Sequence, residues 1–405
     1  MTFPGVGVGV PWAAPGGVFI PSFSNFRSNV LGLGAVTTLP GNHVLTRAST
    51  KTVQTSATAL IQGIPINTAA VGQYGLSLSR SATNLITRSE DLTHADWVLT
   101  NATINAGGAG DFITDPAGGN TGAKISFPGV SSFFKQTSLN FVVAQYALSI
   151  WNKATSGSPQ HNLRAPGPDA ASQNQYSPIL TEGTSWTRNV YIFNVTSGPS
   201  ASVFLDMVDA VHSTGPSTFY GTFYQLEQAN YQEEYIPTPA SAAVTSAADI
   251  LVQPNGLQKY ARGRLGIEYI LRPKGSIGGS NNWASPRNLV VGTGGGTDTI
   301  TVDHVTGLVT VTVAGVAYTT ASGKTFNRGV SDVRYWVESG GGLLQTVVQV
   351  YVDGVVTALG TSGSPQGNWT STSLGLLSSA GGSMLGCDLQ EINYYRAGVR
   401  PAWTI

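Results

Sequence analysis

Carboxylates and histidines are the side chains of this chain whose spacing could support hydrolysis. A glycosidase needs an acid and a second carboxylate on one face, and Glu-x-Asp-x-x-Glu along a strand supplies them. The sequence contains no such spacing. Glu233 and Glu234 are adjacent, so on a strand they would point to opposite sides. Asp303 and His304 precede a Val-Thr-Gly turn with no nucleophile motif nearby, and the other late carboxylates stand singly. These patterns predict that the protein is not an enzyme.

The sequence also gives no support for a metal site or a phosphate site. The five histidines are scattered singly and Cys387 is the one cysteine, which excludes a disulfide framework and a multi-cysteine metal site. We expect Cys387 to be a small buried apolar residue. The glycine-rich stretches 292–296 and 322–325 lie between strands rather than ahead of a helix, so neither offers a helix N-terminus to a phosphate. We expect no metal and no cofactor.

Tryptophans suggest a binding function, because aromatic rings stack on sugars. Trp283 stands in Gly-Ser-Asn-Asn-Trp-Ala-Ser and Trp369 in Gly-Asn-Trp-Thr. Trp151 falls on the side of a strand shared with Gln145 and Ser149, opposite the expected core side. These three are the candidate carbohydrate-binding residues. The alternative is that each fills the rim of a sandwich or a subunit interface, since tryptophan is largely buried on average.

Composition indicates which elements must position these side chains. Of 405 residues 50 are glycine, 41% are hydrophobic and only 10% are charged. Amphipathic helices need charged faces that this chain lacks, whereas short strands with glycine-rich turns tolerate the composition. The 21 basic and 21 acidic side chains balance, and no basic cluster favours nucleic acid. The prediction is an all-β protein that does not bind nucleic acid.

The N-terminal segment is apolar and lacks charge up to Arg27. It has neither the basic start of a signal peptide nor an apolar run long enough to cross a membrane, so we expect no membrane insertion. Its aromatic side chains are Phe3, Trp12, Phe19 and Phe23. Exposed to water, such a segment would be prone to association, so we interpret it as an assembly arm covered by a neighbouring subunit. The alternative is an arm that folds back on its own domain.

Strand patterns become regular after about residue 80. Residues 1–80 are punctuated by proline and glycine, with clean strand patterns only at 42–50 and 73–80. Later strands are expected at 123–127, 133–139, 141–154, 185–195, 201–211 and 219–228. Alternating apolar and polar residues with turn signals between them favour an antiparallel sandwich over 81–240.

Four stretches of this sandwich follow one another in a familiar order: SATNLITRSEDLTHADW (81–97), YALSIWNKA (146–154), SWTRNVYIFNV (185–195) and YQLEQANYQEEYIPT (224–238). They resemble a β-sandwich module that is common in bacteriophage structural proteins and related to carbohydrate-binding modules. HVLTRASTKT (43–52) and QYGLSLSR (73–80) resemble the segment leading into that module in tail and fibre proteins. The resemblance covers about residues 43–250. It implies a tailed-phage virion protein and places Trp97 and Trp186 in the core.

The C-terminal third has a different rhythm. Strands are expected at 263–273, 300–320, 332–339, 343–356, 373–379 and 385–399, with hairpin turns at Ala314-Gly315 and Asp353-Gly354. VYVDGV, SLGLLSS and LQEINYYRAGV occur in the closing order of a concanavalin or laminin G-like jelly roll, which this region resembles over about 255–400. That fold hosts sugar-binding proteins, glycosidases and spacers, so it does not decide function.

The predicted architecture is therefore an irregular N-terminal arm and attachment region (1–80), a sandwich resembling carbohydrate-binding modules (81–240), a linker (241–258) and a jelly roll (259–405). The predicted function is that of a non-enzymatic virion structural protein on the tail or capsid exterior, as a tail fibre, spike or capsid decoration. Its expected partners are other virion proteins through the arm, copies of itself with a trimer favoured, and a host cell-surface glycan.

Two alternatives come from other classes. One is a tail-associated polysaccharide depolymerase whose active site is assembled between subunits. The other is a free secreted sugar-binding protein, against which the missing signal peptide counts. In the favoured interpretation the jelly roll faces the host, because its loops 275–285 and 362–373 are polar and each carries one tryptophan.

Overall fold

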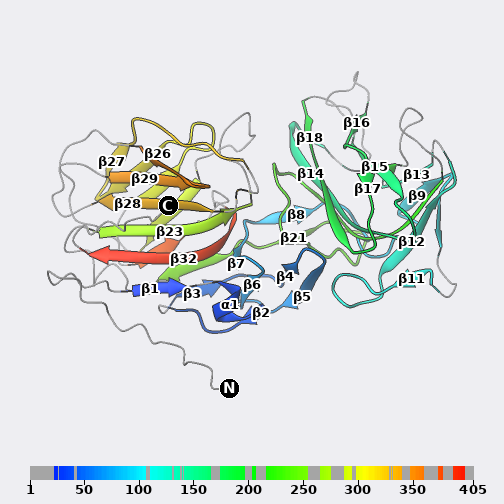
Figure 1. The fold of residues 1–405 in the computed structure, drawn as a ribbon, viewed down its shortest axis with the longest axis horizontal. Helices are drawn as coiled ribbons and strands as arrows, with labels where there is room; N and C mark the ends of the chain where they lie inside the picture. The colour runs from blue at the N-terminus through cyan, green and yellow to red at the C-terminus, as the bar shows by residue number, and fades with distance from the viewer. Residues whose placement is uncertain are drawn as a thin grey trace. The chain divides into compact units, whose positions relative to one another are not determined.

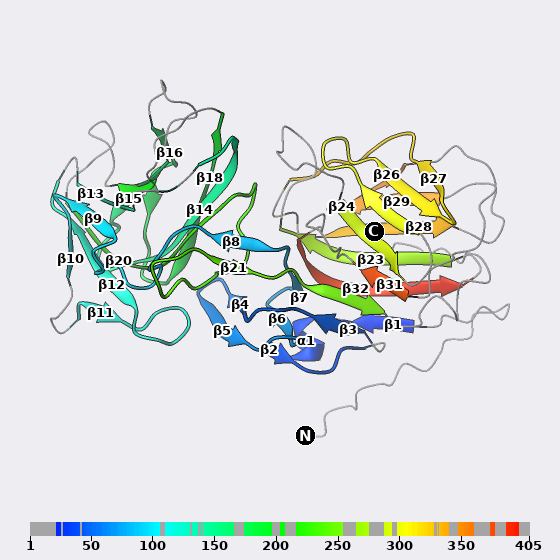
Figure 2. The same cartoon turned by 180° about the vertical axis from the view of Figure 1, so that it is seen from behind.

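The computed structural model confirms an all-β protein. It describes residues 22–25, 27–40, 43–105, 110–129, 132–136, 139, 141–165, 174–196, 203–206, 216–253, 265–274, 287–293, 298–327, 330, 332–339, 347–359, 373–376 and 386–396. Within them the single α-helix is the short α1 (Ser28–Leu31), and the strands pair antiparallel (Figures 1 and 2).

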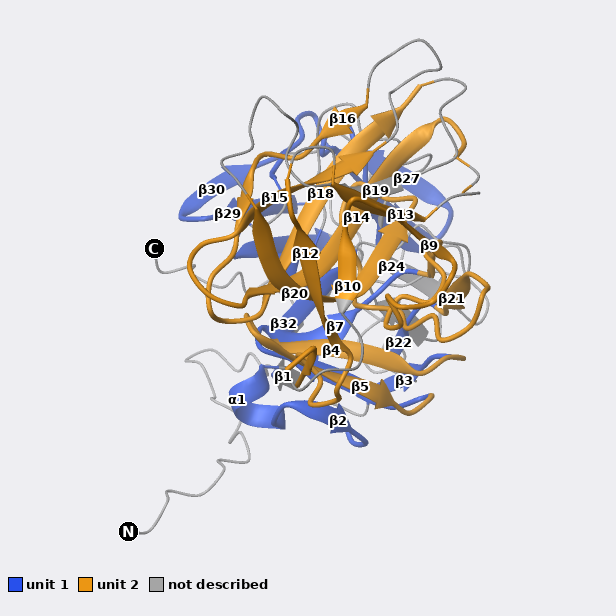
Figure 3. Ribbon diagram, turned by 90° about the vertical axis from the view of Figure 1, so that its right-hand side faces the viewer, with its two compact units in different colours: residues 1–47, 67–80, 248–405 blue, residues 48–66, 81–247 orange. Residues whose placement is uncertain are grey.

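The chain divides into two compact units, and neither is continuous in sequence. Unit 1 comprises residues 1–47, 67–80 and 248–405, and unit 2 comprises 48–66 and 81–247 (Figure 3). Unit 2 is therefore inserted into unit 1, and the chain passes between them four times. The predicted boundary at 80/81 coincides with one of these passages, and the last falls inside the predicted linker 241–258.

Unit 1 is built from two antiparallel sheets. The larger has the order β2-β6-β7-β32-β23-β28-β29-β30, with β1 also paired to β32. Its strands are β1 (Ser22–Asn25), β2 (Gly34–Val36), β6 (Ala69–Gly72), β7 (Gly75–Leu78), β23 (Leu265–Pro273), β28 (Val333–Ser339), β29 (Val347–Val352), β30 (Val355–Ala358) and β32 (Cys387–Arg396). The smaller has the order β27-β26-β25-β24-β31-β22-β3. Its strands are β3 (Val44–Thr46), β22 (Ile250–Gln253), β24 (Arg287–Thr293), β25 (Thr299–Val302), β26 (Val309–Val313), β27 (Val316–Thr319) and β31 (Ser373–Leu376).

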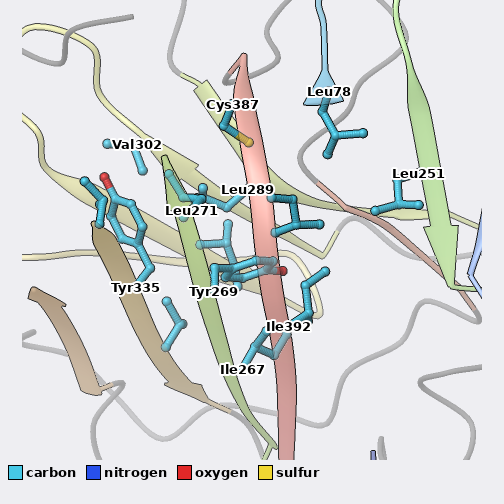
Figure 4. Close-up of a cluster of buried hydrophobic side chains, with 14 of the residues drawn as sticks. Leu78, Leu251, Ile267, Tyr269, Leu271, Leu289, Val302, Tyr335, Cys387 and Ile392 are labelled. Atoms are coloured by element: carbon cyan, nitrogen blue, oxygen red, sulfur yellow. The ribbon is translucent and has the colours of Figure 1, made fainter. Parts of the chain in front are cut away.

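One hydrophobic core lies between these two sheets. Tyr269 and Tyr335 from the larger sheet and Leu289 from the smaller are buried together, with Cys387 among them as expected (Figure 4). Along β26 the valines are buried and the threonines are not, which is the predicted alternation. Both predicted hairpin turns are present: Ala314-Gly315 has φ of 51° and 79°, and Asp353-Gly354 has 41° and 91°. Two successive positive φ values are those of a type I′ turn, the form that suits a two-residue hairpin.

The first 80 residues do not form a region of their own. β7 and β1 pair with β32, β2 pairs with β6, and β3 pairs with β22. Five early strands thus complete the two sheets of unit 1, whereas the sequence-based division kept 1–80 separate. The physical reason is that a sheet edge needs a partner for its free backbone groups, and short early strands supply it.

Unit 2 is a second sandwich. Its first sheet runs β10-β12-β20-β14-β18, with β11 beside β12, and its second runs β16-β15-β19-β13-β9, with β17 beside β15. The first sheet comprises β10 (Thr103–Asn105), β11 (Phe112–Ile113), β12 (Gly122–Phe127), β14 (Ala144–Ala154), β18 (Thr187–Val195) and β20 (Ser217–Glu227). The second comprises β9 (Trp97–Thr100), β13 (Phe133–Gln136), β15 (Gln160–Ala165), β16 (Gln175–Tyr176), β17 (Leu180–Thr181) and β19 (Val203–Asp206).

Two small pairs complete this unit: the hairpin β4 (Lys51–Ser56) with β5 (Ala59–Ile64), and β8 (Ala82–Asn84) with β21 (Val244–Ser246). Aromatic rings fill the core between the two large sheets. Trp97 contacts Phe134 edge-to-face at 5.3 Å, and Phe127 contacts Phe219 at 5.7 Å between ring centroids. Such edge-to-face pairs add to the energy of apolar burial. Trp97 is buried in this core, as the resemblance implied.

A buried ion pair holds together the three segments of unit 1 near the four points at which the chain passes to or from unit 2. Arg47 Nη1 lies 2.7 Å from Asp249 Oδ1, and both side chains are fully buried. Arg47 Nη2 donates to the carbonyl of Thr68 at 3.1 Å, and the amide of Ser79 donates to Asp249 Oδ2 at 2.8 Å. Each of these four residues lies within two positions of a passage. One buried ion pair therefore connects all the points at which unit 2 is inserted into unit 1.

Candidate functional site

The three predicted sugar-binding tryptophans are not brought together. Trp283 and Trp369 lie outside the described residues. Trp151 is fully buried, packed with Leu60, Trp186, Phe223 and Tyr235 in a cluster separate from the main core of unit 2. The prediction that it faces away from that core is confirmed, but its availability to a sugar is corrected, because a second layer covers it.

That second layer includes the hairpin β4–β5. The amide of Gln54 on β4 donates to Glu234 Oε2 at 3.1 Å, and Gln62 Nε2 on β5 donates to Glu90 Oε1 at 3.0 Å. Burial raises the pKa of Glu90, which the Gln62 hydrogen bond partly offsets. The outer face of the β10–β18 sheet is therefore an interior surface. The strand pattern of β14 could not reveal this burial, because the segment that covers it lies some 90 residues earlier in the chain.

The predicted assembly arm is described at its root alone. Phe3, Trp12 and Phe19 lie outside the described residues. Phe23 lies on β1, whose backbone pairs with β32 in the register Phe23 to Asn393. The arm thus leads directly into the larger sheet of unit 1. Whether it meets another chain stays a prediction.

The stretches that carry the phage-module resemblance lie in unit 2 and are bonded to one another. Asn84 Nδ2 donates to the carbonyls of Tyr224 at 3.0 Å and Ile236 at 2.9 Å, and Ser89 Oγ lies 2.6 Å from Tyr235 Oη. All of these hydrogen bonds are buried. These hydrogen bonds therefore join the first of the stretches, 81–97, to the last, 224–238.

The adjacent pair Glu233 and Glu234 belongs to the same closure. Neither residue lies on a strand, so the expected opposite-facing strand geometry is corrected. Glu233 is buried: it accepts from Tyr231 Oη at 2.8 Å and its amide donates to Glu227 Oε1 at 2.9 Å. Gln225 Nε2 donates to the same Glu227 oxygen. These carboxylates serve a folded turn.

A histidine–carboxylate pair lies at one end of the unit 2 core. His161 Nε2 is 3.5 Å from Glu182 Oε1, and both side chains are fully buried. Asn152 Nδ2 donates to His161 Nε2 at 2.7 Å, Asn189 Nδ2 donates to Glu182 at 2.8 Å, and the imidazole stacks on Phe219. Burial lowers the pKa of His161 to about 3 and raises the pKa of Glu182 to about 7. A pair sealed in this way cannot meet a substrate.

Two carboxylates of unit 1 share a face, which strand spacing alone did not reveal. Gly266 pairs with Glu338 and Glu268 pairs with Trp336, so Glu268 and Glu338 are diagonal neighbours on β23 and β28. The expectation that no same-face carboxylate pair exists is therefore corrected. Both are buried, and Trp336 between them is fully buried. Among the described residues, no three histidine, cysteine or carboxylate side chains gather in a way that could hold a metal.

An open face carrying aromatics is found on the second sheet of unit 2. Phe134 and Leu163 are buried in the core, so their strand neighbours point away from it. By register Tyr176, Arg164, Lys135 and Val98 form one row across β16, β15, β13 and β9, with position 204 of β19 between Arg164 and Lys135. The next row contains Phe133, Thr100 and the buried Asn162. Tyr176 and Val98 are 39% and 41% exposed, and Phe133, Lys135 and Arg164 are half-buried. We call these two rows the platform.

Phe133 is the centre of the platform. The guanidinium carbon of Arg164 lies 5.0 Å from its ring centroid, and Lys135 Nζ lies 5.9 Å from it. Both distances are within the range of cation–π attraction, which fixes the two cations beside the ring. The ring therefore offers an apolar surface with two positive charges beside it. Sequence reasoning missed the platform because it searched tryptophans, although the alternation in FFKQ (133–136) already separated Phe133 and Lys135 from the core.

Comparisons with known proteins leave the chain without a family. No family model matches it, and no curated protein matches it. Among solved structures, the N-terminal CBM22-1–CBM22-2 tandem domain of Paenibacillus barcinonensis Xyn10C is 10% identical, with 79% of this chain and 99% of that chain covered and a TM-score of 0.27. A second solved structure is of botulinum neurotoxin type C, whose cell entry depends on interaction with two ganglioside molecules. Its chain is 8% identical, with 85% of this chain and 98% of that chain covered and a TM-score of 0.19. TM-scores this low carry no argument about this chain.

Proposed function

We propose that this chain is a non-enzymatic structural protein of a tailed-phage virion, on the tail or capsid exterior, which attaches the particle to surface glycans through the platform of unit 2. The observation that carries the glycan part is Phe133 flanked by Arg164 and Lys135 on the outer face of a sandwich sheet. The virion part rests on the resemblance of the stretches between 43 and 250.

The chain topology supports a division of labour between the units. Residues 1–47, 67–80 and 248–405 belong to unit 1, and unit 2 is inserted between these segments. An arm that anchors the protein therefore anchors it by unit 1, because β1 at the root of the arm is a strand of the larger sheet there. Unit 2 becomes the displayed part. This reverses the expectation that the jelly roll faces the host.

Sugar recognition needs an apolar surface for the ring face and polar groups around it for the hydroxyls. Phe133 and the partly exposed Tyr176 provide aromatic surface, and Arg164 and Lys135 are polar groups beside it. The platform is carried by five paired strands rather than by a loop, so its groups are held in place before a ligand arrives. No helix of the described residues is long and apolar enough to cross a membrane.

The glycan half of the proposal is tested with an array of bacterial surface polysaccharides and the substitution Phe133→Ala. We expect binding to fall about fivefold, because an aromatic stacking contact contributes on the order of 1 kcal/mol. Val143→Ala is the matched control, since Val143 is 66% exposed on the same unit and lies outside the platform. Binding by neither the wild type nor the control, or equal binding by all three proteins, would contradict the platform's role.

The anchoring half is tested by deleting residues 1–21. We expect a protein with intact sheets that no longer enters particles, since the deletion stops short of β1 (Ser22–Asn25). The measurement is the amount of the truncated protein in purified virions, with its circular dichroism as the folding control. Normal incorporation would remove the arm from the proposal. Subunit mass in solution, measured on the same samples, tests the proposed homo-oligomer, for which a trimer is favoured.

A further inference from the structure

We infer that the edge of strand β18 in unit 2 is a contact between copies of this chain, at which β18 of one copy pairs antiparallel with β18 of another. The inference does not rest on the proposed attachment function. It is carried by the length of this edge, by the residues along it and by the register that its backbone groups impose.

The edge of β18 is long and lacks the usual protection. In the described part of the chain, β18 (Thr187–Val195) is the longest strand that has a partner on one side alone. Proteins commonly protect such an edge with charged residues, proline or a β-bulge. Residues 189–195 contain neither charge nor proline, and the pairing of β18 with β14 runs without a register shift. An edge that is long, apolar and regular is the kind that accepts another strand.

Two apolar side chains of this edge have no core to pack on. Tyr191 and Phe193 pack on the core of unit 2. Val190 and Ile192 alternate with them and therefore point to the outer face of the sheet. Among the described residues, neither of the two is buried and neither belongs to a hydrophobic cluster. Both would gain from a second strand, because cross-strand pairs are what stabilise a sheet.

The backbone of β18 fixes the register of such a pairing. The carbonyl of Asn194 accepts from Gln175 Nε2 at 2.6 Å, so it faces away from β14. Backbone groups alternate along a strand, so those of residues 188, 190 and 192 face the same way. These even-numbered residues lie symmetrically about Tyr191. An antiparallel copy meets all of them when Tyr191 lies opposite Tyr191 of the second copy. The Gln175 hydrogen bond is exposed, so a second strand can replace it.

That register suits a second copy of this chain. Val190 of one copy lies opposite Ile192 of the other, and the two Tyr191 side chains are neighbours. Aromatic and β-branched pairs of this kind are favourable. Arg188 is the one charged residue of the strand, and it lies opposite Asn194, so no like charges meet. A two-fold axis through the Tyr191 pair therefore joins two copies without repulsion.

A contact of like with like closes on a pair, so it yields a dimer rather than the favoured trimer. The pairing of two strands of nine residues lies at the small end of stable interfaces, which makes the dimer sensitive to concentration. Subunit mass in solution therefore separates the two expectations.

The test measures subunit mass by sedimentation equilibrium over a wide range of protein concentration, and the wild type should form dimers. The double variant Val190→Lys, Ile192→Lys should raise the dissociation constant about tenfold or more, because like charges then meet at two pairs. Val190→Glu with Ile192→Glu should weaken pairing in the same way, and a mixture of the Lys and Glu variants should restore it. Val142→Lys with Val143→Lys is the matched control, since these valines are 56% and 66% exposed on the same unit and lie outside β18.

Amide hydrogen exchange of the wild type tests the same contact without a substitution, and circular dichroism checks that each variant is folded. The amides of Val190 and Ile192 should exchange more slowly as the concentration rises, whereas the amide of Tyr191, which faces β14, should change far less. A wild type that stays monomeric, a mass of three copies, or a mass that the Lys variant leaves unchanged would overturn the inference. Protection of the two outward amides that does not depend on concentration would also overturn it, because the edge would then be covered within one chain.

Discussion

The two outer faces of the unit 2 sandwich both carry aromatic side chains, but one face is buried and the other is partly exposed. On the β10–β18 sheet, Trp151 is fully buried beneath a layer that includes the hairpin β4–β5. On the β9–β16 sheet, Tyr176 is 39% exposed and Phe133 is flanked by two cations. Aromatic residues on an outward strand position are therefore not evidence of a binding site. What decides is whether another segment of the chain covers the face.

The covering segment comes from a part of the chain that is easy to misassign. Residues 48–66 belong to unit 2, although the segments on both sides of them, 1–47 and 67–80, belong to unit 1. The hairpin brings Leu60 onto the aromatic cluster of Trp151 and Tyr235. It converts an amphipathic face into interior, which favours stability over recognition. The other face keeps exposed aromatic surface at Tyr176.

The largest expected effect comes from truncating one aromatic on each face. Trp151→Ala should destabilise unit 2 by about 3–5 kcal/mol, because it removes a fully buried large side chain and leaves a cavity. Phe133→Ala should cost far less, since Phe133 is half-buried on the open face. Thermal unfolding followed by tryptophan fluorescence and circular dichroism measures both. Comparable losses for the two variants would mean that the faces do not differ as described.

A smaller effect is expected at the root from which the hairpin leaves unit 1. Asp249→Asn removes the charge that pairs with the fully buried Arg47 and should cost about 2–3 kcal/mol, the scale of a hydrogen bond to a charged group. Asp332→Asn is the matched control, because Asp332 also lies 2.7 Å from an arginine, Arg334, but both side chains are about a quarter exposed. Exposed pairs contribute about 0–1 kcal/mol. Equal losses of unfolding free energy in the two variants would contradict the stabilising role of the buried Arg47–Asp249 pair.

Much of the fold followed from local patterns, whereas the covering of faces did not. The valine–threonine alternation of β26 and the Asp353-Gly354 turn predicted strands and a hairpin because both depend on neighbouring residues. The strands β4 and β5 went unpredicted, since the hairpin is short and its apolar residues do not alternate cleanly. The burial of Trp151 depends on that hairpin, and the pairing of Glu268 with the strand of Glu338 depends on contacts 70 residues apart. Such contacts leave no trace in a strand's own sequence.

A modest effect of pH is expected from His161 and Glu182 in the core between the two faces. The folded protein lowers the pKa of His161 from 6.5 to about 3 and raises the pKa of Glu182 from 4.5 to about 7. From pH 4.5 to 6.5 each state therefore holds one proton on this pair, on the histidine when unfolded and on the carboxyl when folded. The pair should contribute no slope to the stability there. As the pH drops from 4.5 to about 3, the contribution of the pair should fall, because the unfolded state holds two protons and the folded state one. As the pH rises from 6.5 to about 7, the contribution should also fall, because only the folded state still holds a proton.

Glu182→Gln exposes this compensation. Without the carboxyl, the folded protein holds no proton at this pair above about pH 3, so stability should fall as the pH drops from 6.5, by the equivalent of one proton. Urea unfolding at a series of pH values gives the slope of the unfolding free energy for wild type and variant. A double variant that also carries His161→Gln should be flat again over this range. Identical slopes for the wild type and Glu182→Gln would show that the two residues do not exchange a proton on folding.

No effect at all is expected in an assay for polysaccharide cleavage, although unit 1 holds a same-face carboxylate pair. Glu268 and Glu338 occupy diagonal positions on β23 and β28, a placement that would suit the acid and base of a glycosidase if substrate could reach them. Both are buried, however, and Trp336 between them is fully buried, so a sugar chain has no access to either oxygen pair. Wild type, Glu268→Gln and Glu338→Gln should therefore all leave bacterial polysaccharides at their original length, measured as reducing ends released over a long incubation. Glu391→Gln, on the neighbouring strand β32, serves as the control substitution. The contrary outcome is that the wild type releases reducing ends, with the release lost in Glu268→Gln or Glu338→Gln and kept in the control. That outcome would establish the depolymerase alternative and place its site on unit 1 rather than on unit 2.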